Sequence, residues 1–79
     1  MRLDKYLKVS RLVKRRTVAD EMCSAGRVKV NGRPAKSGTR LESGDEIEIA
    51  FGTGATRVKV KSLQPAVRKE EAAELYELL

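Results

Sequence analysis

The chain has 79 residues, of which 41% are hydrophobic, which is enough for one domain with one thin core and too few for a second domain beside it. A large enclosed active-site cleft is therefore not expected. Seventeen Lys and Arg residues stand against eleven Asp and Glu residues, and the net charge of +6 favours a polyanionic partner over an acidic small molecule.

The positive charge lies mostly in one half of the sequence. Residues 1–40 contain twelve basic and three acidic side chains, a net charge of +9, whereas residues 41–79 contain five basic and eight acidic side chains, a net charge of −3. A surface that only keeps a protein in solution mixes both signs. The segregation favours nucleic acid as the partner, with an anionic membrane or a merely solvated basic face as the alternatives.

Cysteine usage indicates a reducing compartment, because Cys23 is the single cysteine and has no partner for an internal disulfide. Its apolar neighbours favour a core thiol over a reactive one. With no histidine in the chain, we expect no metal site and no cofactor. No apolar run approaches the ~20 residues of a membrane span, and the opening MRLDKYLKVS is too charged for a signal peptide, so we expect a cytoplasmic protein without membrane contact.

Two short helices are predicted at the beginning of the chain. Over residues 2–12, apolar side chains recur at helical spacing on one side, and three basic side chains lie on another: Arg2, Lys5 and Lys8. A second helix is predicted over residues 17–25, closed by a glycine just past its end. Thr17 could be its N-cap, but the pattern equally allows a start one turn earlier, at Arg15 or Arg16.

Strands are predicted where apolar residues begin to recur at every second position of the sequence. Residues 27–30 alternate, and Asn31-Gly32 supplies the positive φ of a tight hairpin that returns through Ala35. Residues 47–51 and 57–61 alternate as well and form a second antiparallel pair, with three side chains assigned to the core: Ile47, Ile49 and Phe51. The prediction is a sheet of three to five strands.

A C-terminal helix is predicted over residues 69–79, because four apolar side chains form one stripe: Ala72, Leu75, Tyr76 and Leu79. The fold class is therefore α+β, with two N-terminal helices packed on a small antiparallel sheet and a C-terminal helix as a lid. Residues 1–79 are predicted to form a single RNA-binding domain. The Glu-rich face of the last helix is either solvated or a site for a basic protein partner.

The basic run Lys14, Arg15 and Arg16 lies at the start of the second helix, where cations oppose the positive end of the helix dipole at about 0.3–1 kcal/mol each. Arg2 repeats this placement at the first helix. Selection for stability alone would avoid it, whereas free N–H groups with added cations form a phosphate site. We therefore predict that an RNA backbone neutralises these cations.

Further residues extend this candidate surface. Asp4 is either half of a surface ion pair, with Lys8, or an organiser of the basic side chains around it, and Arg27 belongs either to the patch or to the solvent face of a strand. Because the aromatic residues are assigned to the core, recognition of a folded RNA by backbone and shape is predicted, rather than base stacking. The candidate RNA-binding residues are Arg2, Asp4, Lys5, Lys8, Arg11, Lys14, Arg15, Arg16 and Arg27.

The order helix, basic turn, helix, glycine, strand and Asn-Gly turn resembles the S-four RNA-binding domain, named after the fourth small-subunit ribosomal protein and built on the alpha-L RNA-binding motif. The likeness covers residues 2–51 and is carried by AGRVKVNG at 25–32 and GDEI at 44–47. Many members have Ser-Arg-Ser where this chain has RRT at 15–17. The opening RLDKYL and the tail RKEEAAELY resemble a narrower subgroup that contains RqcP and the fifteen-kilodalton heat-shock protein, which extends the likeness to the C-terminal strand and helix at 56–79.

This resemblance implies binding to a large ribosomal subunit that carries peptidyl-tRNA, with contacts to large-subunit rRNA and to the tRNA. It implies support for ribosome-associated quality control, in which a larger tRNA-recruiting tailing factor adds C-terminal alanine to stalled chains. On the family's motif, the RNA contacts fall on Arg2, Asp4, Lys14, Arg15 and Arg16. A monomer is expected.

Catalysis finds no support in the sequence, which has no histidine, no cysteine-based pair and no phosphate-cradling glycine motif. No catalytic or metal-binding residue is predicted, and the chain is not expected to be an enzyme. Two rival interpretations stay open: an RNA-targeting fragment of a pseudouridine synthase, to which S-four domains are also fused, and a protein-interaction module that uses the acidic terminal helix.

Overall fold

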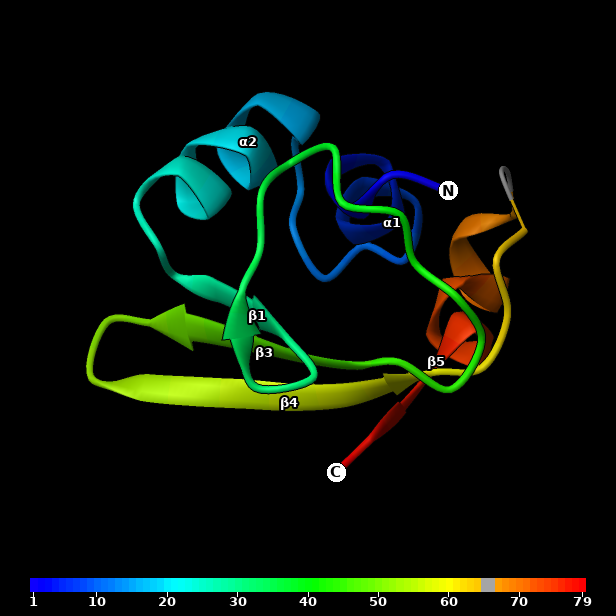
Figure 1. Cartoon of the computed structure of the whole chain (residues 1–79). Helices are drawn as coiled ribbons and strands as arrows, with labels where there is room; N and C mark the ends of the chain where they lie inside the picture. Colours follow the sequence, from blue (N-terminus) through cyan, green and yellow to red (C-terminus); the bar gives the residue numbers. More distant parts are fainter. Residues whose placement is uncertain (65–66) are drawn as a thin grey trace.

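The computed structural model describes residues 1–64 and 67–79 and contains an antiparallel sheet with two helices over one face (Figure 1). The helices are α1 (Leu3–Val9), α2 (Arg16–Ser24) and the 3-10 helix η1 (Lys69–Leu75). The strands are β1 (Val28–Val30), β2 (Arg33–Pro34), β3 (Glu46–Phe51), β4 (Gly54–Val60) and β5 (Tyr76–Leu78), and within the described residues their order in the sheet is β2-β1-β3-β4-β5. The predicted α+β class is confirmed. Residues 65 and 66 of the predicted C-terminal segment lie outside the described residues.

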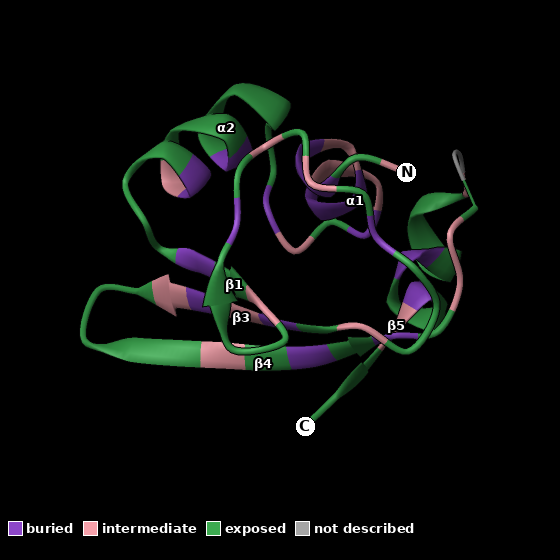
Figure 2. Ribbon diagram, viewed as in Figure 1, coloured by how far each residue is buried: buried purple, intermediate pink, exposed green. Residues whose placement is uncertain are grey.

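Helix α1 is shorter than predicted and is held by its apolar face. Leu3, Tyr6 and Leu7 are fully buried, and Figure 2 shows this burial in purple along the helix and on the strands that face it. The helix ends at Val9, and Arg11 then adopts a φ of 61°. This left-handed conformation is the usual way to end a helix, although glycine adopts it at a lower cost than arginine does.

Helix α2 begins at Arg16, with Arg15 as its N-cap. The earlier of the predicted starts is therefore right, and Thr17 lies inside the helix. Only Ala19 and Cys23 of α2 are buried, so most of its surface faces solvent. Burial raises the pKa of the Cys23 thiol, as expected for a core cysteine. The described part of the chain contains no helix that is long and apolar enough to cross a membrane.

The predicted Asn-Gly hairpin joins β1 to β2. Asn31 and Gly32 have φ values of 52° and 81°, and Val30 pairs with Arg33 across the turn. Asn31 also fixes the hairpin to β3 through two hydrogen bonds. Its side-chain oxygen accepts the backbone N–H of Glu46 at 3.0 Å, and its backbone N–H donates to the Glu46 carbonyl at 2.7 Å. The turn therefore sets the register between β1 and β3.

Strands β3 and β4 form the longest pair of the sheet, and their inner faces build the core. Ile47 and Ile49 are 1% and 0% exposed, as predicted. The core assignment of Phe51 is wrong, since its side chain is 43% exposed. Phe51 is the last residue of β3, directly before the turn at 52–53, where α2 leaves a groove above it instead of packing onto it.

The C-terminal helix begins at Lys69 as predicted, but it is a 3-10 helix that ends at Leu75. The residues that follow pair with β4 as strand β5, with Val60 opposite Tyr76. The apolar stripe is confirmed at Ala72 and Leu75, which are both 2% exposed, whereas Leu79 is 58% exposed and its assignment to the stripe is wrong. Strand pairing along β4 satisfies backbone groups that a longer helix would leave without partners at this sheet edge.

A buried hydrogen bond ties the two ends of the described chain together. The Tyr6 hydroxyl donates to the carbonyl oxygen of Leu75 at 2.6 Å. Tyr6 is 0% exposed, and Leu75 belongs to the same hydrophobic core as α1 and the sheet. Burial, together with the nearby Tyr76, raises the pKa of Tyr6 to about 12. Helix η1 thus completes the core on which the N-terminal helices rest.

Candidate nucleic-acid interface

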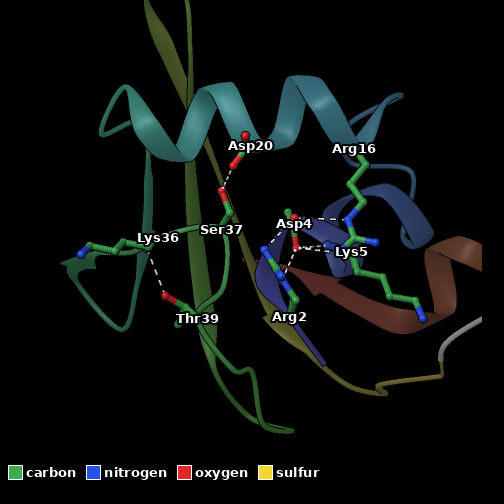
Figure 3. A network of polar contacts seen from close by, with 8 residues as sticks. All are labelled: Arg2, Asp4, Lys5, Arg16, Asp20, Lys36, Ser37 and Thr39. Atoms are coloured by element: carbon green, nitrogen blue, oxygen red, sulfur yellow. Dashed lines mark hydrogen bonds and ion pairs between the residues drawn. The ribbon is translucent and has the colours of Figure 1, made fainter.

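Asp4 is the centre of a polar network that joins α1 to α2 (Figure 3). The Nε atoms of Arg2 and Arg16 donate to its two carboxylate oxygens, each at 3.2 Å, and the backbone N–H of Lys5 donates to Oδ1 at 2.8 Å. The Asp4 side chain is 7% exposed, whereas those of Arg2 and Arg16 are 52% and 49% exposed. We call Arg2, Asp4 and Arg16 the Asp4 network: one buried carboxylate orients two arginines that remain half accessible.

The environment of Asp4 keeps its carboxylate ionised. Burial alone would raise the pKa of this carboxyl, but the hydrogen bonds from Arg16 and Lys5 and the charges of Arg16 and Arg2 outweigh burial and hold the pKa below its ordinary value. Of the two predicted roles of Asp4, the structure therefore shows the organising one, and its partners are arginines rather than Lys8. Arg2 and Arg16 are thus partly neutralised within the protein by Asp4, and their neutralisation by an RNA backbone stays a prediction.

The two helix N-termini differ in how their N–H groups are used. At α1, the N–H groups of Leu3 and Asp4 donate to the carbonyl oxygens of Thr39 and Ser37, so the segment 36–41 fills this terminus. At α2, the N-cap side chain makes no capping bond, and no acceptor within the described residues contacts the N–H groups of residues 16–18. The predicted anion site is therefore open at α2 and closed at α1.

A second surface adjoins the Asp4 network at the start of α2. It is a groove of about 700 Å³ between the connection that precedes α2, one side of α2 and the end of β3. Its apolar lining includes Leu12, Val18, Met22 and Phe51. Its cations are Lys14, Arg15 and Arg27. We call this surface the basic groove. Arg15 lines the groove and Arg16 belongs to the Asp4 network, so the two surfaces meet between consecutive residues.

The candidate residues are thus divided into three groups. Arg2, Asp4 and Arg16 form the network, and Lys14, Arg15 and Arg27 line the basic groove. Arg27 is held there by its backbone, since its N–H donates to the Met22 carbonyl and its carbonyl accepts the N–H of Ala50. The side chains of the remaining three candidates belong to neither set. Lys5 contacts Asp4 only through its backbone N–H, and its side chain extends away from the network in Figure 3. Lys8 and Arg11 are neither partners of Asp4 nor part of the groove lining.

Two parts of this surface were not found from the sequence. The segment 36–41 fills the N-terminus of α1 and is fixed to α2 by the Ser37 hydroxyl, which donates to Asp20 (Figure 3). The only available signal was its charge, since Lys36 and Arg40 belong to the basic half of the sequence. The exposure of Phe51 was missed because strict alternation assigns this residue to the core.

Comparison with known proteins identifies what this architecture is. The S4 domain matches residues 1–47, which contain the Asp4 network, both N-terminal helices and the Asn-Gly hairpin. The chain belongs to the S4 domain family. The resemblance seen in the sequence is confirmed, and the S4 domain is an RNA-binding family rather than a family of enzymes.

Relatives of this S4 protein match it over almost its full length. It is 55% identical to the "RQC P-site tRNA stabilizing factor" of Halalkalibacterium halodurans over 78 residues, which are 99% of this chain and 89% of the relative. It is 48% identical to the protein of the same name from Bacillus subtilis, over 100% of this chain and 92% of the relative. Among solved structures, the trimeric Vibrio cholerae Heat Shock Protein 15 has a TM-score of 0.93 at 31% identity, with 100% of this chain and 81% of that chain covered.

Proposed function

We propose that this S4 protein binds large ribosomal subunits that carry peptidyl-tRNA and supports ribosome-associated quality control by holding large-subunit rRNA and tRNA. In this role it assists a tRNA-recruiting tailing factor that adds alanine to stalled chains. The proposal is supported by relatives named RQC P-site tRNA stabilizing factor that match nearly the whole chain. A ribosome-bound role places the protein in the cytoplasm.

The observation that carries the proposal is the half-exposed arginine pair of the Asp4 network beside the open N-terminus of α2. Guanidinium groups bind phosphate through paired hydrogen bonds, and free backbone N–H groups at a helix N-terminus add to this attraction. Asp4 fixes two of these groups before RNA arrives, so less side-chain freedom is lost on binding. Lys14 and Arg15 supply further charge next to the same helix end.

The direct test is co-sedimentation with purified large ribosomal subunits, with and without peptidyl-tRNA. We expect more of the protein in the pellet when peptidyl-tRNA is present. If five basic side chains neutralise about five phosphates, log affinity for the subunit falls with log salt at a slope of roughly −4. These side chains are Arg2, Lys14, Arg15, Arg16 and Arg27. Equal sedimentation with both kinds of subunit would remove the tRNA part of the proposal, and a flat salt response would remove the phosphate contacts.

Arg15→Ala is the variant best matched to this test. Arg15 is exposed and belongs to no ion pair among the described residues, so its removal leaves the Asp4 network in place. We expect weaker binding and a salt slope that is smaller in magnitude by about 0.7–0.9. Lys59→Ala is the control, because Lys59 is exposed between the buried residues Val58 and Val60 and therefore lies on the sheet face opposite to the helices.

The rival functions make different demands on the structure. A pseudouridine synthase needs a catalytic domain, whereas the relatives that match nearly the whole chain are named RQC P-site tRNA stabilizing factor, so we propose a non-catalytic role. Residues 1–79 are proposed to act as one RNA-binding domain, with the motif at 2–51 resting on the C-terminal segment. The expected monomer stays a prediction, which sedimentation velocity tests.

A further inference from the structure

The basic groove combines apolar and basic side chains in a way that the phosphate contacts of the proposed function do not use. Phe51 and Val18 are 43% and 39% exposed, although burying such side chains is worth about 1.5–3 kcal/mol each. Three cations surround them, and the groove lining contains no acidic residue. Its volume of about 700 Å³ falls within the ~300–1,000 Å³ of typical ligand sites.

Phe51 is distinctive among the aromatic residues. Tyr6 is fully buried and Tyr76 is partly buried, so Phe51 is the most exposed aromatic residue in the described chain. It is fixed at the end of β3, where its backbone pairs with Gly54. A ring held on a strand end provides a stable face for stacking, and every nucleobase has a face that can stack on it.

We infer that the basic groove accepts one unpaired nucleotide of the bound RNA, with its base on the Phe51 ring and its phosphate groups beside Lys14, Arg15 and Arg27. The inference rests on the proposed function and adds a subsite to it. Continuity supports it: an RNA backbone on the Asp4 network at Arg16 reaches Arg15, the next cation, at the mouth of the groove.

A nucleotide accounts for both the apolar and the basic side chains that line the groove. An apolar peptide segment would leave three cations without counter-charges beside it, whereas a nucleotide brings an apolar, stackable base together with its own negative charge. The structure thereby adds a base-stacking platform to a protein whose sequence predicted recognition by backbone and shape alone. The RNA that fits best is a helix with a bulged or flipped base next to its phosphate contacts.

The test compares three RNA hairpins with the same stem: one with a single bulged adenosine, one with an abasic nucleotide at the bulge, and one fully paired. The abasic hairpin keeps the bulge phosphate and lacks only the base. We expect the full-length protein to bind the adenosine bulge at least about fivefold more tightly than the abasic bulge, because stacking of one base on an aromatic ring is worth that factor or more.

Two variants locate the effect at Phe51. Phe51→Leu keeps an apolar side chain without a stacking face, and we expect it to bind the adenosine and abasic bulges equally while melting like the parent protein. The chain contains no tryptophan, so Phe51→Trp introduces a single fluorophore in the groove. We expect its emission to be quenched by the adenosine bulge and to be unchanged by the abasic one.

The outcomes separate this subsite from the proposed function. Equal binding of the two bulged hairpins, with the salt dependence intact, overturns the subsite and leaves RNA binding in place. No binding to any hairpin or to large ribosomal subunits overturns both. If an acidic amphipathic peptide shifts the emission of the Phe51→Trp variant while the adenosine bulge does not, the groove is a protein-docking surface and the nucleotide subsite is wrong.

Discussion

Replacing Asp4 by asparagine separates charge from orientation at the candidate RNA interface. Asp4→Asn removes one of the eleven acidic residues, so the net charge rises from +6 to +7. If net attraction to RNA decided affinity, the variant would bind more tightly. If the Asp4 network orients Arg2 and Arg16 before binding, the variant binds more weakly despite its higher charge. The two accounts therefore differ in sign.

The hydrogen bonds of Asp4 set the expected loss of stability and the expected loss of RNA affinity. Asp4 accepts charge-assisted hydrogen bonds from two arginines, each worth about 1.5–3 kcal/mol when buried, and solvent at the half-exposed guanidinium groups reduces each towards about 1 kcal/mol. We expect Asp4→Asn to lower the free energy of unfolding by about 2–3 kcal/mol and the Tm by roughly 10–20 °C. Freeing two arginine side chains costs about 0.5–1.5 kcal/mol each on binding, which weakens RNA affinity at least about fivefold.

Glu21→Gln is the matched control, because Glu21 is exposed on α2 and forms no ion pair among the described residues. It makes the same change in net charge without touching the network. Affinities are measured by fluorescence anisotropy with a labelled rRNA fragment, at a temperature where circular dichroism shows every variant to be folded. If folded Asp4→Asn binds as tightly as Glu21→Gln, the reasoning about orientation is refuted.

The same carboxylate predicts acid sensitivity. The pKa of Asp4 is lower in the folded protein than its ordinary value of 3.8, so its contribution to stability is fully present above that value. It is lost as the pH falls through the lower folded pKa, where the carboxylate is protonated. In urea titrations at a series of acidic pH values, the parent protein should lose stability in this range more steeply than Asp4→Asn does; parallel curves would contradict the assignment.

Three further predictions concern single side chains. Tyr6→Phe removes the buried hydrogen bond to Leu75 and should lower the free energy of unfolding by about 1–2 kcal/mol, as measured by urea titration. The pKa of Tyr6 is raised from 10.0 to about 12. The parent protein should therefore lose stability as the pH rises through this interval, and the variant should lose less. Arg11→Gly relieves the left-handed φ of 61° and should raise stability by about 0.5–1 kcal/mol, with weaker RNA binding if Arg11 is a contact; a lower Tm would show that the arginine stabilises the helix end. Cys23 should react with a thiol reagent far more slowly in the folded protein than in urea, since burial raises its pKa; equal rates would contradict a core thiol.

Local chemistry allowed the sequence to predict most of the fold. The Asn31-Gly32 turn, the alternation of Ile47 and Ile49, and the apolar spacing of the first helix each depend on residues within a few positions of one another. Features of this kind follow from backbone preferences and periodicity alone. The cationic start of α2 was visible for the same reason, as a run of consecutive residues.

The errors arose where distant segments decide the structure. The pairing of Asp4 with Arg16 spans twelve positions and depends on how α1 packs against α2, so side-chain spacing within one helix could not show it. The last residues have helical spacing, yet pairing with β4 makes Tyr76–Leu78 a strand, because backbone hydrogen bonds along an open sheet edge outweigh a weak helix preference. Phe51 continues the alternation of Ile47 and Ile49, but its exposure depends on whether α2 packs onto the end of β3, and the structure has a groove there instead.

The bond between Tyr6 and Leu75 has a consequence for how the protein is made. α1 contains Asp4 of the Asp4 network, but its buried face packs against Leu75, which lies 69 positions after Tyr6 in the sequence. Until Leu75 has been translated, α1 lacks one of its core contacts and the hydrogen bond of Tyr6. The ion pairs of Asp4 with Arg2 and Arg16 then form on a helix that is not yet fully packed. We therefore expect the Asp4 network to take its final geometry late in folding, after Leu75 has joined the core.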